Sequence, residues 1–124
     1  MDKQAFFDLC IKKYLTYPDF PWDGEETAVF RHNDNKKWFA LVMNIQRSKL
    51  GLNSNQKTDV INLKIPTDLL GSFTCEDAVY PAYHMNKAHW ISVILEDASD
   101  KTVNFLLNAS YEATAVNKMK RKND

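Results

Sequence analysis

A chain of 124 residues with 44% apolar and 12% aromatic residues can bury the core of one domain. Its 16 basic and 16 acidic side chains give a formal net charge of zero, which argues against a strongly basic nucleic-acid-binding protein. The sequence has no apolar run of 18 residues and no signal-like start, and two cysteines are too few for a disulfide framework or a metal quartet. We therefore expect a soluble cytoplasmic protein with no cofactor, no metal and no membrane partner, and we favour a monomer.

The hydrophobic pattern predicts helices near both ends of the chain and strands between them. Apolar residues recur at helical spacing near the ends, while runs of β-branched and aromatic residues separated by turn-forming residues fill the middle. The expected elements are a helix over 3–16 capped by Asp2, strands over 27–32, 37–43 and 60–65, a short helix over 67–73, an extended segment over 78–83, a strand over 89–95 and a helix capped by Ser99.

This order of elements predicts the fold class. Helices on either side of a run of antiparallel strands favour an α+β two-layer sandwich, with both helices packed on one face of the sheet. The other face would be partly solvated, and function could reside there. We expect residues 1–116 to form one domain and residues 117–124 to form a basic tail that frays. The polar stretch 44–59 is expected to be a long loop, of a length that is uncommon unless it has a function.

The charges are unevenly distributed along the chain. Residues 1–30 carry a net charge of −3 and residues 65–114 a net charge of −5, whereas residues 31–64 carry +5 and residues 115–124 carry +3. A basic face could therefore attract phosphate although the whole molecule is neutral. The alternative is an ordinary mixed surface of solvated charges.

The run Tyr83-His84-Met85-Asn86-Lys87-Ala88-His89-Trp90 resembles the signature of the MmcQ/YjbR family. Other stretches resemble the family in the same order along the chain, over about residues 3–115. These stretches are Tyr17-Pro18, 20–23, 28–31, 38–42, 62–64 with Pro66, and 110–112. The resemblance implies a frataxin-like (CyaY-like) fold and a DNA-binding function, in which two hairpin-like wings contact the nucleic acid.

Two groups of residues are the candidate nucleic-acid contacts. Lysine and arginine can neutralise phosphates, while aromatic and histidine rings can stack on bases and asparagine can read a base edge. Phosphate contacts are expected from Arg31, Lys36, Lys37, Arg47 and Lys49, and base or sugar contacts from Tyr83, His84, Asn86, Lys87 and His89. The hypothesis requires the first hairpin and the 44–59 loop to project together. The alternative for the second group is a structural turn in which Asn86 adopts a left-handed conformation and Trp90 fills the core.

The sequence does not indicate an enzyme. Cys10 lies on the apolar side of the first predicted helix, and Cys75 stands beside two acidic residues, which would weaken it as a nucleophile. His84 and His89 are five positions apart, so on one strand they would face opposite ways and could not share a metal. The sequence contains no glycine-rich phosphate loop and no serine-centred nucleophile motif.

Two functions follow as hypotheses. The first is weak, salt-sensitive and non-enzymatic binding of DNA through basic wings. The second is a protein-interaction or small-ligand module that uses the open sheet face and the Tyr83–Trp90 loop as an aromatic-lined cleft. A continuous positive stripe would favour the first hypothesis, and an exposed apolar patch near Trp38 or Tyr83 would favour the second.

Overall fold

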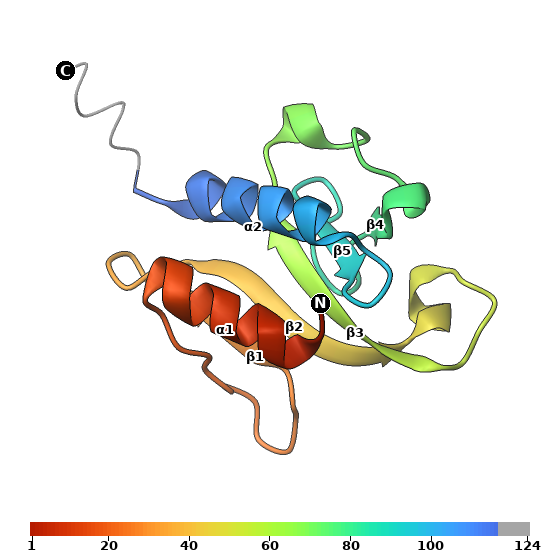
Figure 1. Ribbon diagram of the computed structural model, residues 1–124, viewed down its shortest axis with the longest axis horizontal. Coiled ribbons are helices and arrows are strands. Elements are labelled where there is room, and N and C mark those ends of the chain that lie inside the picture. Colours follow the sequence, from red (N-terminus) through yellow and green to blue (C-terminus); the bar gives the residue numbers. More distant parts are fainter. Residues whose placement is uncertain (117–124) are drawn as a thin grey trace.

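In the computed structural model, which describes residues 1–116, two helices cover one face of a five-stranded antiparallel sheet (Figure 1). The strands lie in the order β1-β2-β3-β5-β4. The elements are α1 (Lys3–Tyr14), β1 (Ala28–Arg31), β2 (Trp38–Gln46), β3 (Lys57–Lys64), β4 (Val79–Pro81), β5 (Trp90–Ile94) and α2 (Asp100–Thr114). The predicted α+β class, the antiparallel sheet and the two terminal helices are confirmed. The expected basic tail, 117–124, lies outside the described residues.

Both helices begin where the sequence predicts. The Asp2 carboxylate accepts a hydrogen bond from the Ala5 N–H at 2.8 Å, and the Ser99 hydroxyl accepts one from the Thr102 N–H at 3.1 Å. Helix α1 ends at Tyr14, two residues earlier than predicted, because Leu15 adopts a left-handed conformation with φ of 54°. The N–H of Leu15 then bonds to the Ile11 carbonyl and closes the last turn.

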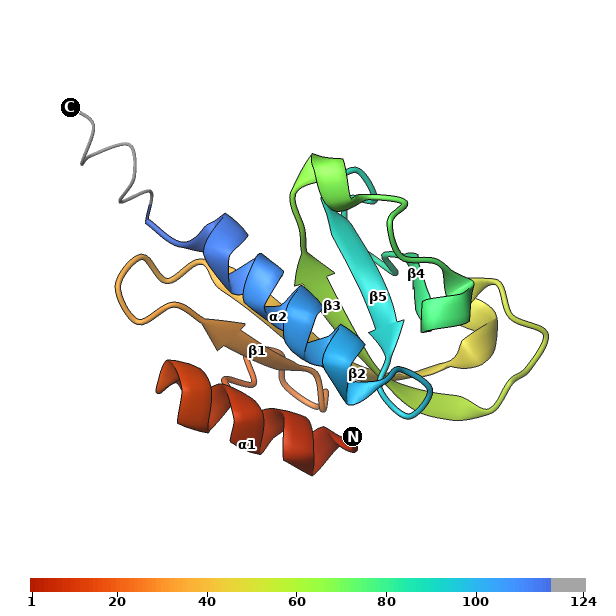
Figure 2. The ribbon, with the colours of Figure 1, turned by 45° about the horizontal axis from the view of Figure 1, so that its top comes forward.

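The core lies between the helices and the sheet. Phe30 of β1 packs against Phe6 of α1, with ring centroids 6.2 Å apart, and Phe39 of β2 packs against Tyr14 at 5.3 Å. Helix α2 joins this layer through Ser110, whose hydroxyl donates to the Phe39 carbonyl at 2.6 Å and accepts the Lys64 N–H at 2.9 Å. Apolar packing and a polar link therefore fix both helices on the same face (Figure 2).

The predicted long loop over 44–59 is too long at both ends, because residues 44–46 and 57–59 belong to strands. Strands β2 and β3 pair from Ala40↔Leu63 to Gln46↔Lys57, which leaves only residues 47–56 as the connection, with a 3₁₀ turn at Arg47–Leu50. Polar residues alternate with apolar ones here because one side of the hairpin is solvated. The short helix expected over 67–73 is also reduced, to a single 3₁₀ turn at Thr67–Leu69.

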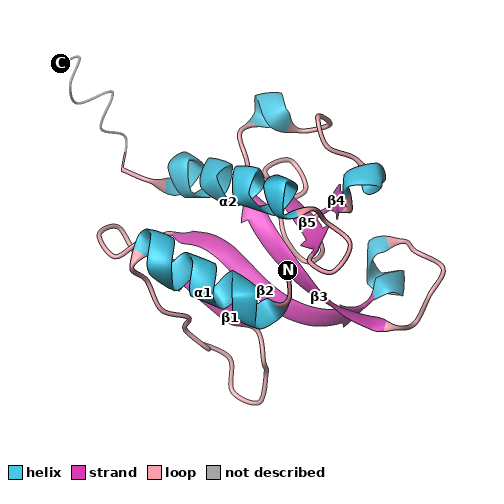
Figure 3. Ribbon diagram, viewed as in Figure 1, coloured by secondary structure: helices cyan, strands magenta, loops and turns pink. Residues whose placement is uncertain are grey.

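Both edges of the sheet are blocked (Figure 3). Asp19 forms a bridge to Val29 of β1, with N···O distances of 2.9 and 2.7 Å in the two directions. Strand β4, at the other edge, has three residues and includes Pro81, which has no N–H to donate. Neither edge is therefore suited to pairing with a strand from another protein.

Candidate ligand-binding groove

The helices leave the opposite face of the sheet uncovered, and a β-bulge decides which side chains lie there. Phe30 pairs with Ala40 but Arg31 pairs with Trp38, so the register skips Phe39. The extra residue lets Phe39 join the helix-facing core while Trp38 shares the open face with Leu41. Without the bulge, Trp38 and Leu41 would face opposite ways.

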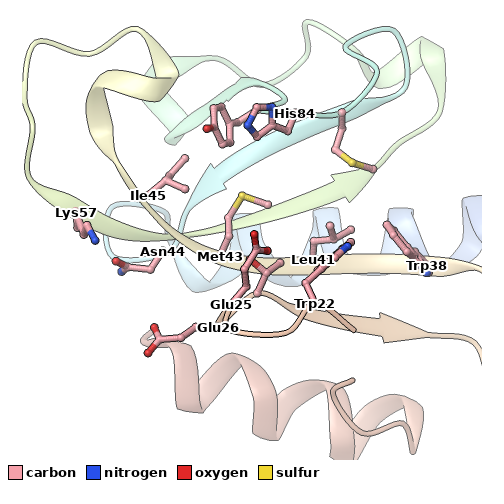
Figure 4. A pocket seen from close by; sticks show the side chains of 13 residues that line it. Trp22, Glu25, Glu26, Trp38, Leu41, Met43, Asn44, Ile45, Lys57 and His84 are labelled. Atoms are coloured by element: carbon pink, nitrogen blue, oxygen red, sulfur yellow. The ribbon is translucent and has the colours of Figure 1, made fainter. Parts of the chain in front are cut away.

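A groove of about 610 Å³ runs along this open face (Figure 4). Its floor is the open side of β2, one wall is the segment before β1, and the other wall is the loop between β4 and β5. The principal lining residues are Trp38, Leu41, Met43 and Ile45 on the floor, Trp22, Glu25 and Glu26 on the first wall, and Tyr83, His84 and Met85 on the second. The volume lies in the range of about 300–1,000 Å³ that is typical of small-molecule sites.

Two tryptophans form an aromatic corner at one end of the groove. The rings of Trp22 and Trp38 lie 5.7 Å apart at an angle of 88°. The Arg31 guanidinium lies 5.4 Å from the Trp38 ring centroid and pairs with Asp19 at 2.9 Å. Arg31, a predicted phosphate contact, is thus already engaged by an aromatic ring and a carboxylate.

Two buried polar side chains fix the second wall. Asn62 of β3 donates to the Tyr83 carbonyl at 2.9 Å, and Ser92 of β5 accepts from the Tyr83 N–H at 2.9 Å. The Ser92 hydroxyl in turn donates to the Asn62 side-chain oxygen. Both side chains are fully buried, and each polar atom of this network has a partner. The network holds the backbone of Tyr83 over the open face.

The rest of the signature run forms a structured turn. The Asn86 side-chain oxygen accepts from the Ala88 N–H at 2.9 Å, and its carbonyl accepts from the N–H groups of His89 and Trp90. Asn86 is thus used within the turn, although the left-handed residue is His84, with φ of 60°, and not Asn86 as expected. His84, Lys87 and His89 are exposed.

The predicted basic wings do not project together. Lys36 and Lys37 lie in the turn before β2, whereas Arg47 and Lys49 follow its far end (Figure 2). Strand β2 has nine residues, so the two groups are separated by about 30 Å. The prediction that the first hairpin and the 44–59 loop project together is wrong, because the connection 47–56 lies at the end of β2 that is farthest from the β1–β2 turn.

Arg47 links the end of β2 to the turn after β5 through two ion pairs. Its guanidinium donates to Asp97 at 2.7 Å and to Glu96 at 3.0 Å, and Glu96 also accepts from the Thr58 hydroxyl at 2.6 Å. The hydrogen bond from Thr58, helped by Arg47, lowers the pKa of Glu96, while the bond to Asp97 raises the pKa of Arg47. Arg47 is therefore occupied by carboxylates and is poorly placed to bind phosphate.

Other lysines do converge at the hairpin end of the sheet. Lys36 and Lys37 lie in the β1–β2 turn, and Lys64 is the last residue of β3. Lys87 belongs to the β4–β5 loop, which lies at the same end because the Ile65 N–H donates a hydrogen bond to the His89 carbonyl. None of these four lysines forms an ion pair within residues 1–116. Carboxylates of Asp34 and Glu112 also lie at this end, since both influence the pKa of the buried His32. The positive charge there is therefore interrupted.

The described part of the chain has neither a metal site nor a membrane span. Within residues 1–116, no three histidine, cysteine, aspartate or glutamate side chains come close enough to hold a metal ion. No helix in this part is both long and apolar enough to cross a bilayer. Burial raises the pKa of Cys10 to about 12, so its thiol is protonated at neutral pH and cannot act as a nucleophile.

A protein-family model, YjbR, matches residues 11–113, which is most of the chain. The chain belongs to the YjbR family. Among its relatives is the uncharacterized protein YyaQ of Bacillus subtilis, which is 39% identical over 97 residues, covering 77% of this chain and 82% of YyaQ. The resemblance inferred from the Tyr83–Trp90 run is confirmed.

Solved structures of bacterial proteins share the fold. The crystal structure of a Pseudomonas syringae protein is 45% identical and superposes with a TM-score of 0.88, covering 93% of this chain and 100% of that one. A protein of Deinococcus radiodurans, 22% identical, superposes with a TM-score of 0.71 over 98% of this chain and 86% of its own, and it shows the fold alone.

Several groove residues were not singled out from the sequence. Leu41, Met43 and Ile45 alternate along β2, but the sequence around them predicts a continuous apolar strand that is followed by a loop. The alternation itself was the available signal, since residues two apart share one face. The position of Trp22 and Glu25 opposite the Tyr83 loop depends on tertiary structure that no local pattern encodes.

Proposed function

We propose that this protein is a small-ligand-binding module that takes a mostly apolar molecule in the groove on its open sheet face. The observation that carries the proposal is the groove itself, with two tryptophans and four aliphatic or methionine side chains on a face that the helices leave uncovered. Leu41 and Met43 are already buried, so an apolar ligand would gain about 25 cal/mol per Å² mainly from the surface that Trp22, Trp38 and Met85 still expose. The proposal makes the protein a binder and not an enzyme.

Titration with a neutral fluorescent dye, N-phenyl-1-naphthylamine, tests the proposal. We expect saturable binding with enhanced dye emission, because the dye leaves water for the groove. Met85→Lys places a charge in the apolar wall and should weaken binding at least about tenfold. Phe105→Lys, on an exposed position of α2, is the matched control and should bind as wild type. Equal loss in both variants, or no saturable binding by wild type, would reject the groove as a site.

DNA binding is the second candidate, and the observation that favours it is the group of four lysines at the hairpin end. Such contacts would be weak and sequence-independent, with affinity falling as salt rises. A fluorescence-anisotropy titration of a labelled duplex at low salt provides the test. The double variant Lys36→Glu/Lys37→Glu should lose binding, whereas Lys49→Glu, at the opposite end of β2, should retain it. If wild type does not bind the duplex at the lowest salt, this candidate is eliminated.

A further inference from the structure

We infer that the groove selects an amphiphilic cation, whose ammonium group lies at the Trp22–Trp38 corner beside Glu25 and whose apolar body lies along β2. The inference rests on the proposed ligand-binding function and names the class of ligand. Three features of the corner support it: the geometry of the rings, the acidic wall and the direction of the apolar floor.

The two tryptophan rings present surfaces suited to a cation. They meet nearly at right angles, with centroids 5.7 Å apart, so a group in the corner contacts both. A cation within about 6 Å of an indole face is attracted by the negative face of the ring, and substituted ammonium groups are commonly recognised in this way. Trp38 already makes such a contact with Arg31 at 5.4 Å. The charge of Arg31 is compensated by Asp19 and so repels a second cation only weakly.

A tight turn places Glu25 on the wall that carries Trp22. The Glu25 N–H bonds to the Trp22 carbonyl at 3.2 Å, and Gly24, with φ of 75°, supplies the left-handed residue that this turn needs. Glu25 therefore lies on the same wall as Trp22 and next to Met43, whereas Glu26 lies farther from the tryptophans, on the side of Asn44 and Lys57 (Figure 4). Neither carboxylate forms an ion pair within residues 1–116. The acidic wall is thus available to a positively charged ligand.

The side chains along the floor of the groove indicate which end of the ligand lies at which end of the groove. From Trp38, the open face of β2 continues through Leu41, Met43 and Ile45 to Lys57, which lies at the other end of the groove (Figure 4). A cationic head at the Lys57 end would meet a like charge that offsets the Glu26 carboxylate, whereas at the tryptophan end it meets aromatic faces and Glu25 with no lysine among the lining residues there. Only the second orientation places the apolar body on the apolar floor with its charge complemented.

Displacement of bound N-phenyl-1-naphthylamine tests the inference with three probes of equal chain length, each below its micelle concentration. These are octyltrimethylammonium, neutral octyl glucoside and anionic octyl sulfate. We expect octyltrimethylammonium to displace the dye at concentrations at least about fivefold lower than the other two. Because the ammonium–carboxylate attraction is screened by salt, this preference should shrink between 20 mM and about 500 mM salt.

Two matched substitutions, each of which removes one negative charge, test whether Glu25 determines the preference for a cation. Glu25→Gln should reduce the affinity for octyltrimethylammonium about threefold or more and leave that for octyl glucoside unchanged. Glu76→Gln, an exposed acid outside the groove, should change neither. If wild type binds the dye but the cation has no advantage, or Glu25→Gln has no effect on it, the inference fails while the groove remains a site. If wild type does not bind the dye at all, the proposed function fails and the inference falls with it.

Discussion

At the scale of single residues, His32 is the buried titratable group best defined by its contacts. Its Nε2 lies 2.8 Å from the Thr114 hydroxyl oxygen, and that hydroxyl donates its proton to the Ser110 carbonyl at 2.8 Å. The hydroxyl must therefore accept from His32, so Nε2 carries the proton of the neutral ring. Burial lowers the pKa of His32, although the nearby Asp34 carboxylate acts in the opposite direction.

This lowered pKa predicts a pH-dependent stability. Because the folded state holds His32 neutral below its ordinary pKa of about 6.5, the unfolded state binds more protons as the pH falls through that value. The free energy of unfolding should therefore decrease between pH 7 and pH 5. His32→Phe removes the titrating group, leaves Thr114 bonded to Ser110, and should flatten the dependence.

Urea unfolding at a series of pH values measures this effect. His89→Gln, at an exposed histidine, should keep the wild-type dependence. Parallel curves for wild type and His32→Phe would show that His32 does not cause the pH dependence.

At the scale of elements, the buried pair Asn62 and Ser92 joins the sheet to the groove wall. Ser92→Ala leaves the Tyr83 N–H without its partner and should lower the free energy of unfolding by about 1–3 kcal/mol. The same change should weaken dye binding, because it releases the loop that carries Met85.

Chemical denaturation and the dye titration together check this prediction. Ser72→Ala, at an exposed serine in a turn, should alter the free energy of unfolding by less than about 0.5 kcal/mol. A Ser92→Ala protein with wild-type stability would contradict the role assigned to the network.

Arg47 connects the end of β2 to the turn between β5 and α2. Arg47→Met removes two charge-assisted contacts while keeping much of the side-chain volume, and should reduce stability by about 1 kcal/mol at low salt. The loss should be smaller at high salt, because Glu96 and Asp97 are solvent-accessible. Lys49→Met changes a lysine that forms no ion pair within residues 1–116, and it should be nearly neutral in thermal unfolding. A salt-independent loss in Arg47→Met would point to packing instead of charge.

The elements that local rules specify were predictable from the sequence. The caps Asp2 and Ser99 and the apolar stripe of α2 gave both helices, since capping and helical periodicity act within a few residues. The extensions of β2 and β3 into 44–59 were harder to predict, because their polar residues are strand residues on a solvated side, and only the alternation of Leu41, Met43 and Ile45 indicates that β2 continues.

At the scale of the whole molecule, topology decides which predicted contacts can act together. The candidates Lys36, Lys37 and Lys87 share one end of the sheet, whereas Arg47 and Lys49 lie at the other. Charge counts along the chain could not reveal this separation. Lys37 and Arg47 are close in sequence, but the nine residues of β2 between them run the length of the sheet. The sequence predicts the Tyr83 loop as a functional element. Its position over an apolar face is fixed by the hydrogen bonds of Asn62 and Ser92, which local sequence patterns do not indicate.

The central claim is that ligands bind on the open sheet face, and NMR chemical-shift mapping on the intact chain tests it most directly. Uniformly labelled protein titrated with N-phenyl-1-naphthylamine should show progressive shifts at Leu41, Met43, Ile45 and Met85, and at the Trp22 and Trp38 indole N–H groups. Resonances of α2 residues facing away from the sheet should remain in place. Shifts confined to positions outside the groove, or a duplex that perturbs Lys36 and Lys87 while the dye perturbs nothing, would contradict the account.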